Sequence, residues 1–146
     1  MSEVFESALA DALRRLKSAD RFESEIRDAL AKYDEETIQQ VVDLLRQKRV
    51  LDDRRLVTTL VERNTGRSAV GPLRLRAKLE ARGAPPSEID EALASTTEFE
   101  SDNANALLSA RFPGKIESDR ARAGRLLLSR GFDVDLIESV VDRYFS

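Results

Sequence analysis

Apolar residues recur every three or four positions along nearly the whole chain, as they do on one face of a helix, and no stretch alternates in a sustained strand pattern. Glycine, proline and capping acids interrupt this pattern at intervals. The pattern therefore predicts an all-α protein with nine helices. The first three are expected at residues 4–18, 22–33 and 34–48, and the last three at 100–111, 118–130 and 133–145. Between them we expect a helix from Asp52 or Asp53 to about Asn64, a helix at 71–82, and a short helix that carries Ile89, Ala92 and Leu93.

The boundaries of these helices rest on residues with known positional preferences. Acids open the third helix at 34–36, and Asp133 is suited to cap the last one. Pro72 is expected in a first helical turn, where its missing N–H costs nothing, and Gly83 just past a helix end. The apolar face of the first helix is expected to include Leu9, Ala12, Leu13 and Leu16.

The helices fall into three sets that resemble one another. Residues 79–93, "LEARGAPPSEIDEAL", align with residues 127–141, "LLSRGFDVDLIESVV", at an offset of 48, which pairs Arg82 with Arg130 and Gly83 with Gly131. A single three-helix unit buries little apolar surface, so neighbouring units are expected to stack. We predict three tandem three-helix repeats, at 1–49, 50–97 and 98–146, that form an elongated, curved array. The alternative is one globular helical domain with chance periodicity.

Composition narrows the functional classes. The 146-residue chain has no cysteine and no histidine, so it lacks thiolate chemistry and the usual general base at neutral pH. The paired acids at 52–53 and 34–36 stand at predicted helix starts, where capping explains them, and "DVD" at 133–135 lacks the glycine and glutamate of a calcium loop. We expect no catalytic residue, no metal site and no cofactor. Without an apolar run near 18 residues or a leader, the chain is also expected to be a soluble, cytoplasmic monomer that does not bind a membrane.

The charge is distributed in blocks. The chain as a whole carries 24 basic and 27 acidic residues, yet residues 46–82 hold 11 basic against 4 acidic, and residues 111–130 hold 6 against 2. The segments between and around these blocks are acidic. In the second and third sets the middle helix is therefore basic and the last helix acidic.

The basic residues of the middle helices are spaced so that they could share one surface. Arg74, Lys78 and Arg82 follow each other at i, i+4 and i+8, and the 48-residue offset places Arg122 and Arg130 at the positions of Arg74 and Arg82. Such a surface complements a polyanion or an acidic protein. The alternative is that each acidic helix neutralises its basic neighbour, as Arg76 and Glu80 are expected to do. The residues predicted to form a partner-binding basic track are Arg63, Arg67, Arg74, Lys78, Arg82, Arg122, Arg125 and Arg130.

The ordered set of motifs resembles the RecX family, regulators of the RecA recombinase. Its central signature looks like a Leu-Asp-Asp start, arginines on the helix that follows, and a glycine-led basic helix that ends in a basic residue and glycine. The tail "LLLSRGFDVDLIESVV" also looks like the closing unit of that family. The residues that carry the central signature here are Leu51, Asp52, Asp53, Arg55, Arg63, Gly71, Arg74, Leu79, Arg82 and Gly83.

This resemblance implies a non-catalytic modulator. Such a protein lies in the helical groove of a RecA filament on single-stranded DNA and lowers strand exchange and the coupled ATP hydrolysis. It implies RecA as the partner, with the single-stranded DNA contacted indirectly or weakly. The alternative is a helical nucleic-acid-binding module that acts directly on DNA, against which stand the net charge of −3 and the lack of aromatic residues among the arginines.

Overall fold

The computed structural model describes residues 2–146, and within them the chain is helical, with no β-strand. The all-α prediction is therefore confirmed. The helices are α1 (Glu3–Ser18), α2 (Glu23–Ala29), α3 (Glu35–Gln47), α4 (Asp53–Arg63), α5 (Pro72–Ala81), α6 (Pro86–Ala94), α7 (Glu100–Arg111), α8 (Arg120–Ser129) and α9 (Val134–Tyr144), with short 3₁₀ turns η1 (Gly66–Ser68), η2 (Thr97–Phe99) and η3 (Glu117–Asp119).

Three of these helices have an aspartate as their N-cap residue, as the sequence predicts. Each cap lies in an extended backbone conformation, and its carboxylate accepts a hydrogen bond from an N–H group of the first turn, which has no partner inside the helix. The caps are Asp34 for α3, Asp52 for α4 and Asp133 for α9.

Two details differ from the sequence prediction. The second helix was expected to reach residue 33, but α2 ends at Ala29, because hydrogen bonds from the N–H groups of residues 30 and 31 to carbonyls three positions back tighten the chain into a turn. In α1, Leu13 was expected on the apolar face, but it is 46% exposed. Phe5 and Ala8 are buried in its place, because the inward stripe begins one turn earlier.

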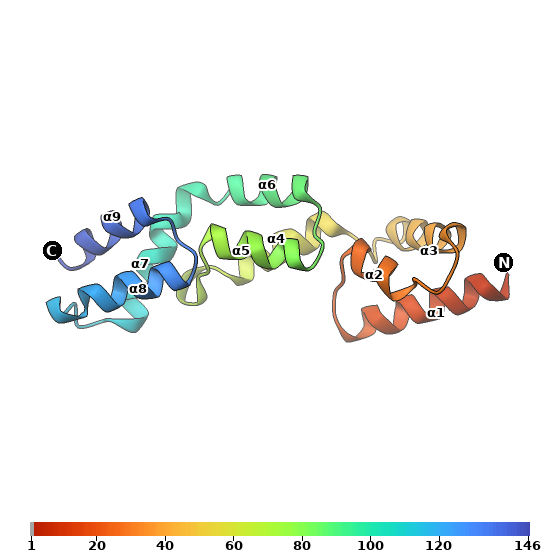
Figure 1. Ribbon diagram of the computed structural model, residues 1–146, viewed down its shortest axis with the longest axis horizontal. Helices are drawn as coiled ribbons and strands as arrows, with labels where there is room; N and C mark the ends of the chain where they lie inside the picture. Colours follow the sequence, from red (N-terminus) through yellow and green to blue (C-terminus); the bar gives the residue numbers. More distant parts are fainter. Residues whose placement is uncertain (1) are drawn as a thin grey trace.

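Across residues 2–146 the helices form an elongated row, with the two ends of the chain at opposite ends of the row (Figure 1). Three buried clusters lie along it, one within α1–α3, one within α4–α6 and one within α7–α9. Three buried residues cross between the sets: Phe22 packs in the cluster of α4–α6, Leu51 in that of α1–α3, and Ala69 in that of α7–α9. The elongated arrangement is thus confirmed, whereas the division into repeats at 49/50 and 97/98 stays a prediction.

Between residues 2 and 146, no helix is both long enough and apolar enough to cross a membrane.

Candidate functional site

The middle helices of the three sets, α2, α5 and α8, follow one another along the row (Figure 1). At the second junction, between α5 and α8, the N–H of Gly71 donates to the Arg130 carbonyl at 2.6 Å, and the N–H of Leu73 donates to the Gly131 carbonyl at 3.2 Å. These bonds satisfy groups at two helix ends that have no partner within their own helices. They also set the partial positive end of α5 against the partial negative end of α8, which is a favourable alignment of dipoles.

Glycine is required on both sides of this second junction. A Cβ atom on Gly71 would overlap the Gly131 carbonyl and the Phe132 nitrogen, and a Cβ atom on Gly131 would overlap the backbone of Arg74. Gly131 also has a φ of 88°, which other residues rarely adopt. The backbones therefore approach more closely than any side chain allows.

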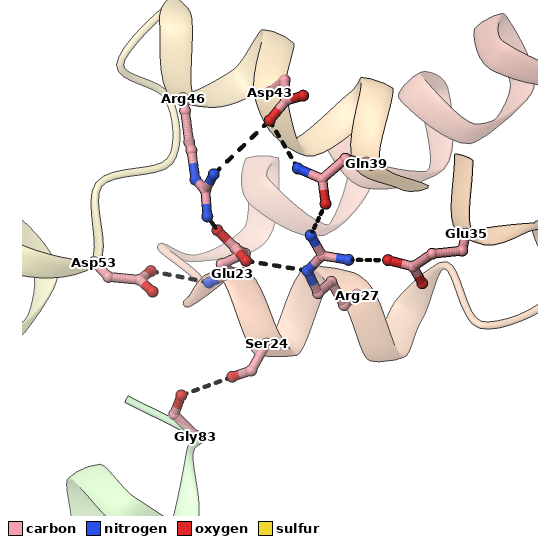
Figure 2. Close-up of polar contacts among 9 residues, drawn as sticks. All are labelled: Glu23, Ser24, Arg27, Glu35, Gln39, Asp43, Arg46, Asp53 and Gly83. Atoms are coloured by element: carbon pink, nitrogen blue, oxygen red, sulfur yellow. Dashed lines mark hydrogen bonds and ion pairs between the residues drawn. The ribbon is translucent and has the colours of Figure 1, made fainter. Parts of the chain in front are cut away.

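The first junction, between α2 and α5, has the same direction but uses side chains. The Ser24 hydroxyl donates to the Gly83 carbonyl at 2.8 Å, and the N–H of Glu23 donates to the Asp53 carboxylate at 2.9 Å (Figure 2). A Cβ atom on Gly83, whose φ is 83°, would overlap the Ser24 hydroxyl. At the start of α5 the N–H groups bind backbone carbonyls, whereas at the start of α2 the N–H of Glu23 binds a carboxylate.

The two arginines that precede these glycines make equivalent contacts. The Arg82 guanidinium donates to the Asp20 carbonyl at 3.0 Å, and that of Arg130 donates to the Ala69 carbonyl at 3.3 Å. Each of these carbonyls lies two residues before the N-cap of the preceding middle helix, Phe22 or Gly71. Both arginines thus fasten one set of helices to the next.

Arg82 makes further contacts that Arg130 lacks. It pairs with the Glu25 carboxylate at 2.8 Å and lies over the Phe22 ring at 5.0 Å. Burial raises the pKa of Glu25, but the hydrogen bonds from Arg82 and from the Phe22 N–H more than offset it, so the pKa lies below its ordinary value. At Asp53 burial prevails over the bond from the Glu23 N–H and raises the pKa.

A polar network anchors the start of α2 to α3 (Figure 2). Glu23 pairs with Arg46 and, at 3.0 Å, with Arg27, which in turn reaches Glu35 at 2.8 Å. Arg46 also lies 3.8 Å from Asp43. The two arginines lie among three carboxylates and join α2 to α3, so the network supports the first junction. Across the described residues, no cluster of acids is arranged to hold a metal ion.

The structure separates the eight predicted track residues into three groups. Arg82 and Arg130 are half-buried fasteners, as described above. Arg74 and Arg122 are exposed but already bonded, Arg74 to the Ser129 carbonyl at 3.0 Å and Arg122 to the Asp119 carboxylate at 2.9 Å. The remaining four are exposed, and no carboxylate of residues 2–146 lies within 4.0 Å of them: Arg63, Arg67, Lys78 and Arg125.

These four free cations do not all lie on one element. Lys78 belongs to α5 and Arg125 to α8, which are consecutive middle helices. Arg63 ends α4 and Arg67 lies in η1, so these two belong to the connection between α4 and α5. A single track through all eight residues therefore stays a prediction. Only these four free cations can bind a partner without first breaking a contact within residues 2–146.

Comparison with known proteins decides the family. No family model matches the chain. A regulatory protein RecX of Leptothrix cholodnii is 31% identical over 134 residues, which cover 89% of this chain and 84% of that protein. The chain belongs to the RecX family. A regulatory protein RecX of Clostridioides difficile is 29% identical over 149 residues, or 97% of this chain and 69% of that protein.

Solved RecX structures share the fold. The crystal structure of RecX from Lactobacillus salivarius superposes with a TM-score of 0.81 at 19% identity and covers 99% of this chain and 98% of its own. A second crystal structure, of a regulatory protein RecX, gives a TM-score of 0.75 at 26% identity, with 96% of this chain and 74% of its own covered.

Several residues that carry the RecX resemblance lie at the two junctions. Asp53, Arg82 and Gly83 build the first junction, and Gly71 with Arg74 builds the second. The signature therefore describes how the sets are fastened together. Sequence reasoning missed the partners of these residues on α2, Ser24 and Glu25, because nothing local distinguishes them from ordinary first-turn residues.

Proposed function

We propose that the chain binds a RecA recombinase filament and, without catalysis of its own, lowers the ATP hydrolysis and strand exchange of RecA. Membership of the RecX family supports a regulatory role. The observation that supports contact with an acidic partner is the exposure of Lys78 and Arg125. Neither has a carboxylate partner within residues 2–146, and they lie on α5 and α8, two consecutive middle helices of the row. An elongated protein that presents cations at successive positions suits a long, repetitive and acidic partner.

The free cations are proposed to act mainly on the rate of association. Charged groups that are exposed before binding steer a partner over distances of about the Debye length, roughly 10 Å at 0.1 M salt. Arg63 and Arg67 add to the same field from the α4–α5 connection. Arg82 and Arg130 act indirectly, because they hold the helices that present the free cations. With a net charge of −3, the chain is proposed to touch the single-stranded DNA of the filament only weakly.

The test is titration of the chain into a RecA ATPase assay on single-stranded DNA. We expect the native chain to inhibit, and Lys78→Glu with Arg125→Glu to weaken inhibition by roughly 10- to 100-fold at low salt. The matched control is Lys17→Glu with Lys48→Glu, which changes the charge equally at exposed residues of α1 and of the α3 end. Thermal melts should show both variants folded.

Two results would contradict the proposal. One is inhibition by the Lys78 and Arg125 variant equal to that of the native chain. The other is tight binding of bare single- or double-stranded DNA in a gel shift without RecA, which would favour the nucleic-acid-binding alternative.

A further inference from the structure

Two of the most exposed large apolar side chains flank the second junction. Leu73 is 63% exposed and Leu128 is 58% exposed. The Leu128 carbonyl accepts from the Gly131 N–H at 3.1 Å, and the Gly131 carbonyl accepts from the Leu73 N–H at 3.2 Å. Gly131 thus lies between the two leucines, because its N–H binds the backbone of Leu128 and its carbonyl binds the backbone of Leu73. Neither leucine is needed by the cores, because Leu75 and Leu127 fill the inward positions.

A small side chain shares the exposed side of each leucine on its helix. Along α5, Leu73 is followed at i+4 by Ala77, and along α8, Leu128 is preceded at i−7 by Ala121, all on the exposed side. An alanine covers little of a helix surface, so no large side chain stands at these two positions.

Cations without carboxylate partners border the same surface. Arg74 and Lys78 lie on the exposed side of α5, and Arg125 lies between Ala121 and Leu128 on α8. Two nearby acids are paired with other arginines: Glu80, which follows Leu73 and Ala77 on the same side of α5, approaches Arg76 at 3.8 Å, and Asp119 binds Arg122 at 2.9 Å. We call the surface formed by Leu73, Arg74, Lys78, Arg125 and Leu128 the junction patch.

We propose that the junction patch docks a segment of a protein partner that carries acidic side chains and at least one large apolar side chain. The cations call for carboxylates, and the two leucines call for an apolar group that removes them from water. Nucleic acid is a poorer match, because phosphates would face the leucines. A lipid surface is also a poorer match, because a membrane-bound helix needs a continuous apolar face, whereas the exposed cations Lys78 and Arg125 interrupt the exposed sides of α5 and α8.

This inference rests on the proposed function and deepens it. It adds to the proposed contact with the RecA filament an apolar component of the binding free energy, which salt does not screen. Apolar burial is insensitive to moderate ionic strength, whereas the attraction between exposed charges weakens as salt rises. Binding of the native chain should therefore fall with salt to a residual level set by the leucines.

The experiment measures binding of labelled chain to RecA filaments on single-stranded DNA by anisotropy, from about 0.05 to 0.5 M KCl. Leu73→Ser with Leu128→Ser should weaken binding by roughly tenfold at every salt concentration. Lys78→Glu with Arg125→Glu should weaken it strongly at low salt and little at high salt. The matched control, Leu13→Ser with Ile116→Ser, changes two other exposed apolar side chains and should bind as the native chain does.

The outcomes separate the two proposals. If the leucine variant binds as the native chain at every salt concentration, the junction patch is wrong and the proposed function stands. If the native chain does not bind RecA filaments, both are wrong. If the leucine substitutions weaken binding to bare DNA or to anionic vesicles without RecA, the partner is not an acidic protein segment and the junction patch proposal is overturned.

Discussion

Both junctions join the start of one middle helix to the end of the next, but the second junction uses backbone groups and the first uses side chains. At the second junction, backbone N–H groups of α5 bind backbone carbonyls at the end of α8 directly, which requires glycine at both 71 and 131. At the first junction, the corresponding end of α2 is bound through the side chains of Ser24, Glu25 and Asp53. Only one glycine, Gly83, is needed there.

The second junction also has a second point of attachment. The turn η1 packs against α7, where the Gly66 N–H donates to the Asn103 side chain at 3.2 Å, and Ala69 is fully buried in the cluster of α7–α9. At the first junction, the contacts gather around the residues just before and at the start of α2, and the buried side chains of Phe22 and Leu51 each pack in the cluster of the other set. The difference teaches that α4–α9 is clamped mainly by uncharged backbone groups and a buried alanine, whereas the contacts that hold α1–α3 include an ion pair and carboxylates that salt and pH can change.

The largest expected effect is at Gly71, and it tests whether close backbone approach holds the second junction. The φ of Gly71 is −68°, which alanine adopts readily, so the cost of Gly71→Ala is the overlap with the Gly131 carbonyl and the loss of its hydrogen bonds. We expect a loss of about 2–4 kcal/mol in the free energy of unfolding, measured by urea denaturation.

Gly124 provides the matched control for this substitution. It lies within α8, and a Cβ atom there would meet only the Ile137 side chain, at an ordinary contact distance of 3.9 Å. Gly124→Ala should stabilise the fold by about 0.5–1 kcal/mol, because alanine loses less backbone entropy in a helix. Equal effects of the two substitutions would contradict the account of the second junction.

The next effect compares the two fastening arginines. Arg82 contacts a carboxylate, a carbonyl and an aromatic ring, whereas Arg130 contacts one carbonyl. Arg82→Gln should therefore cost about 1–2 kcal/mol after allowance for solvent screening, since the Arg82 side chain is 34% exposed. Arg130→Gln should cost about 0.5 kcal/mol. Thermal unfolding of both variants checks the order, and a larger loss for Arg130→Gln would show that the first junction does not depend on its ion pair.

Particular residues show how far the sequence alone leads. The caps Asp34, Asp52 and Asp133 were predictable because a cap acts on its own first turn. The equivalence of Arg82 and Arg130 was visible in the 48-residue offset, but their role was not, because their partners lie about 60 residues away in the chain and include backbone carbonyls. An outward leucine could have been foreseen in the run 126–128, since successive helical residues point about 100° apart.

A smaller effect, with a defined pH dependence, is expected at Glu25. Its folded pKa lies below the ordinary value of 4.5, so its carboxylate contributes stability above pH 4.5, and that contribution is lost as pH falls through the folded pKa. Glu25→Gln keeps an oxygen that accepts from the Phe22 N–H and loses the charge opposite Arg82. We expect a cost of about 1 kcal/mol at pH 7 that fades as the pH falls below 4.5 and through the lowered folded pKa in denaturation series. A cost that does not change with pH would assign the role to packing.

The smallest effect is expected at Asp53, and it has the opposite sign to that of Glu25. Burial raises the folded pKa of Asp53 above 3.8, so the charged form costs stability above the folded pKa, and this cost disappears once the pH falls below 3.8. Asp53→Asn retains an oxygen to accept from the Glu23 N–H and removes the buried charge. We therefore expect a gain within about 0.5 kcal/mol at pH 7 and no difference in acid, measured in the same denaturation series. Because Glu25 and Asp53 belong to one junction, opposite pH trends for the two variants would show that the charge of Glu25 stabilises this junction and that the charge of Asp53 opposes it. A loss of stability for Asp53→Asn at pH 7 would instead mean that the hydrogen bond to Glu23 requires the carboxylate.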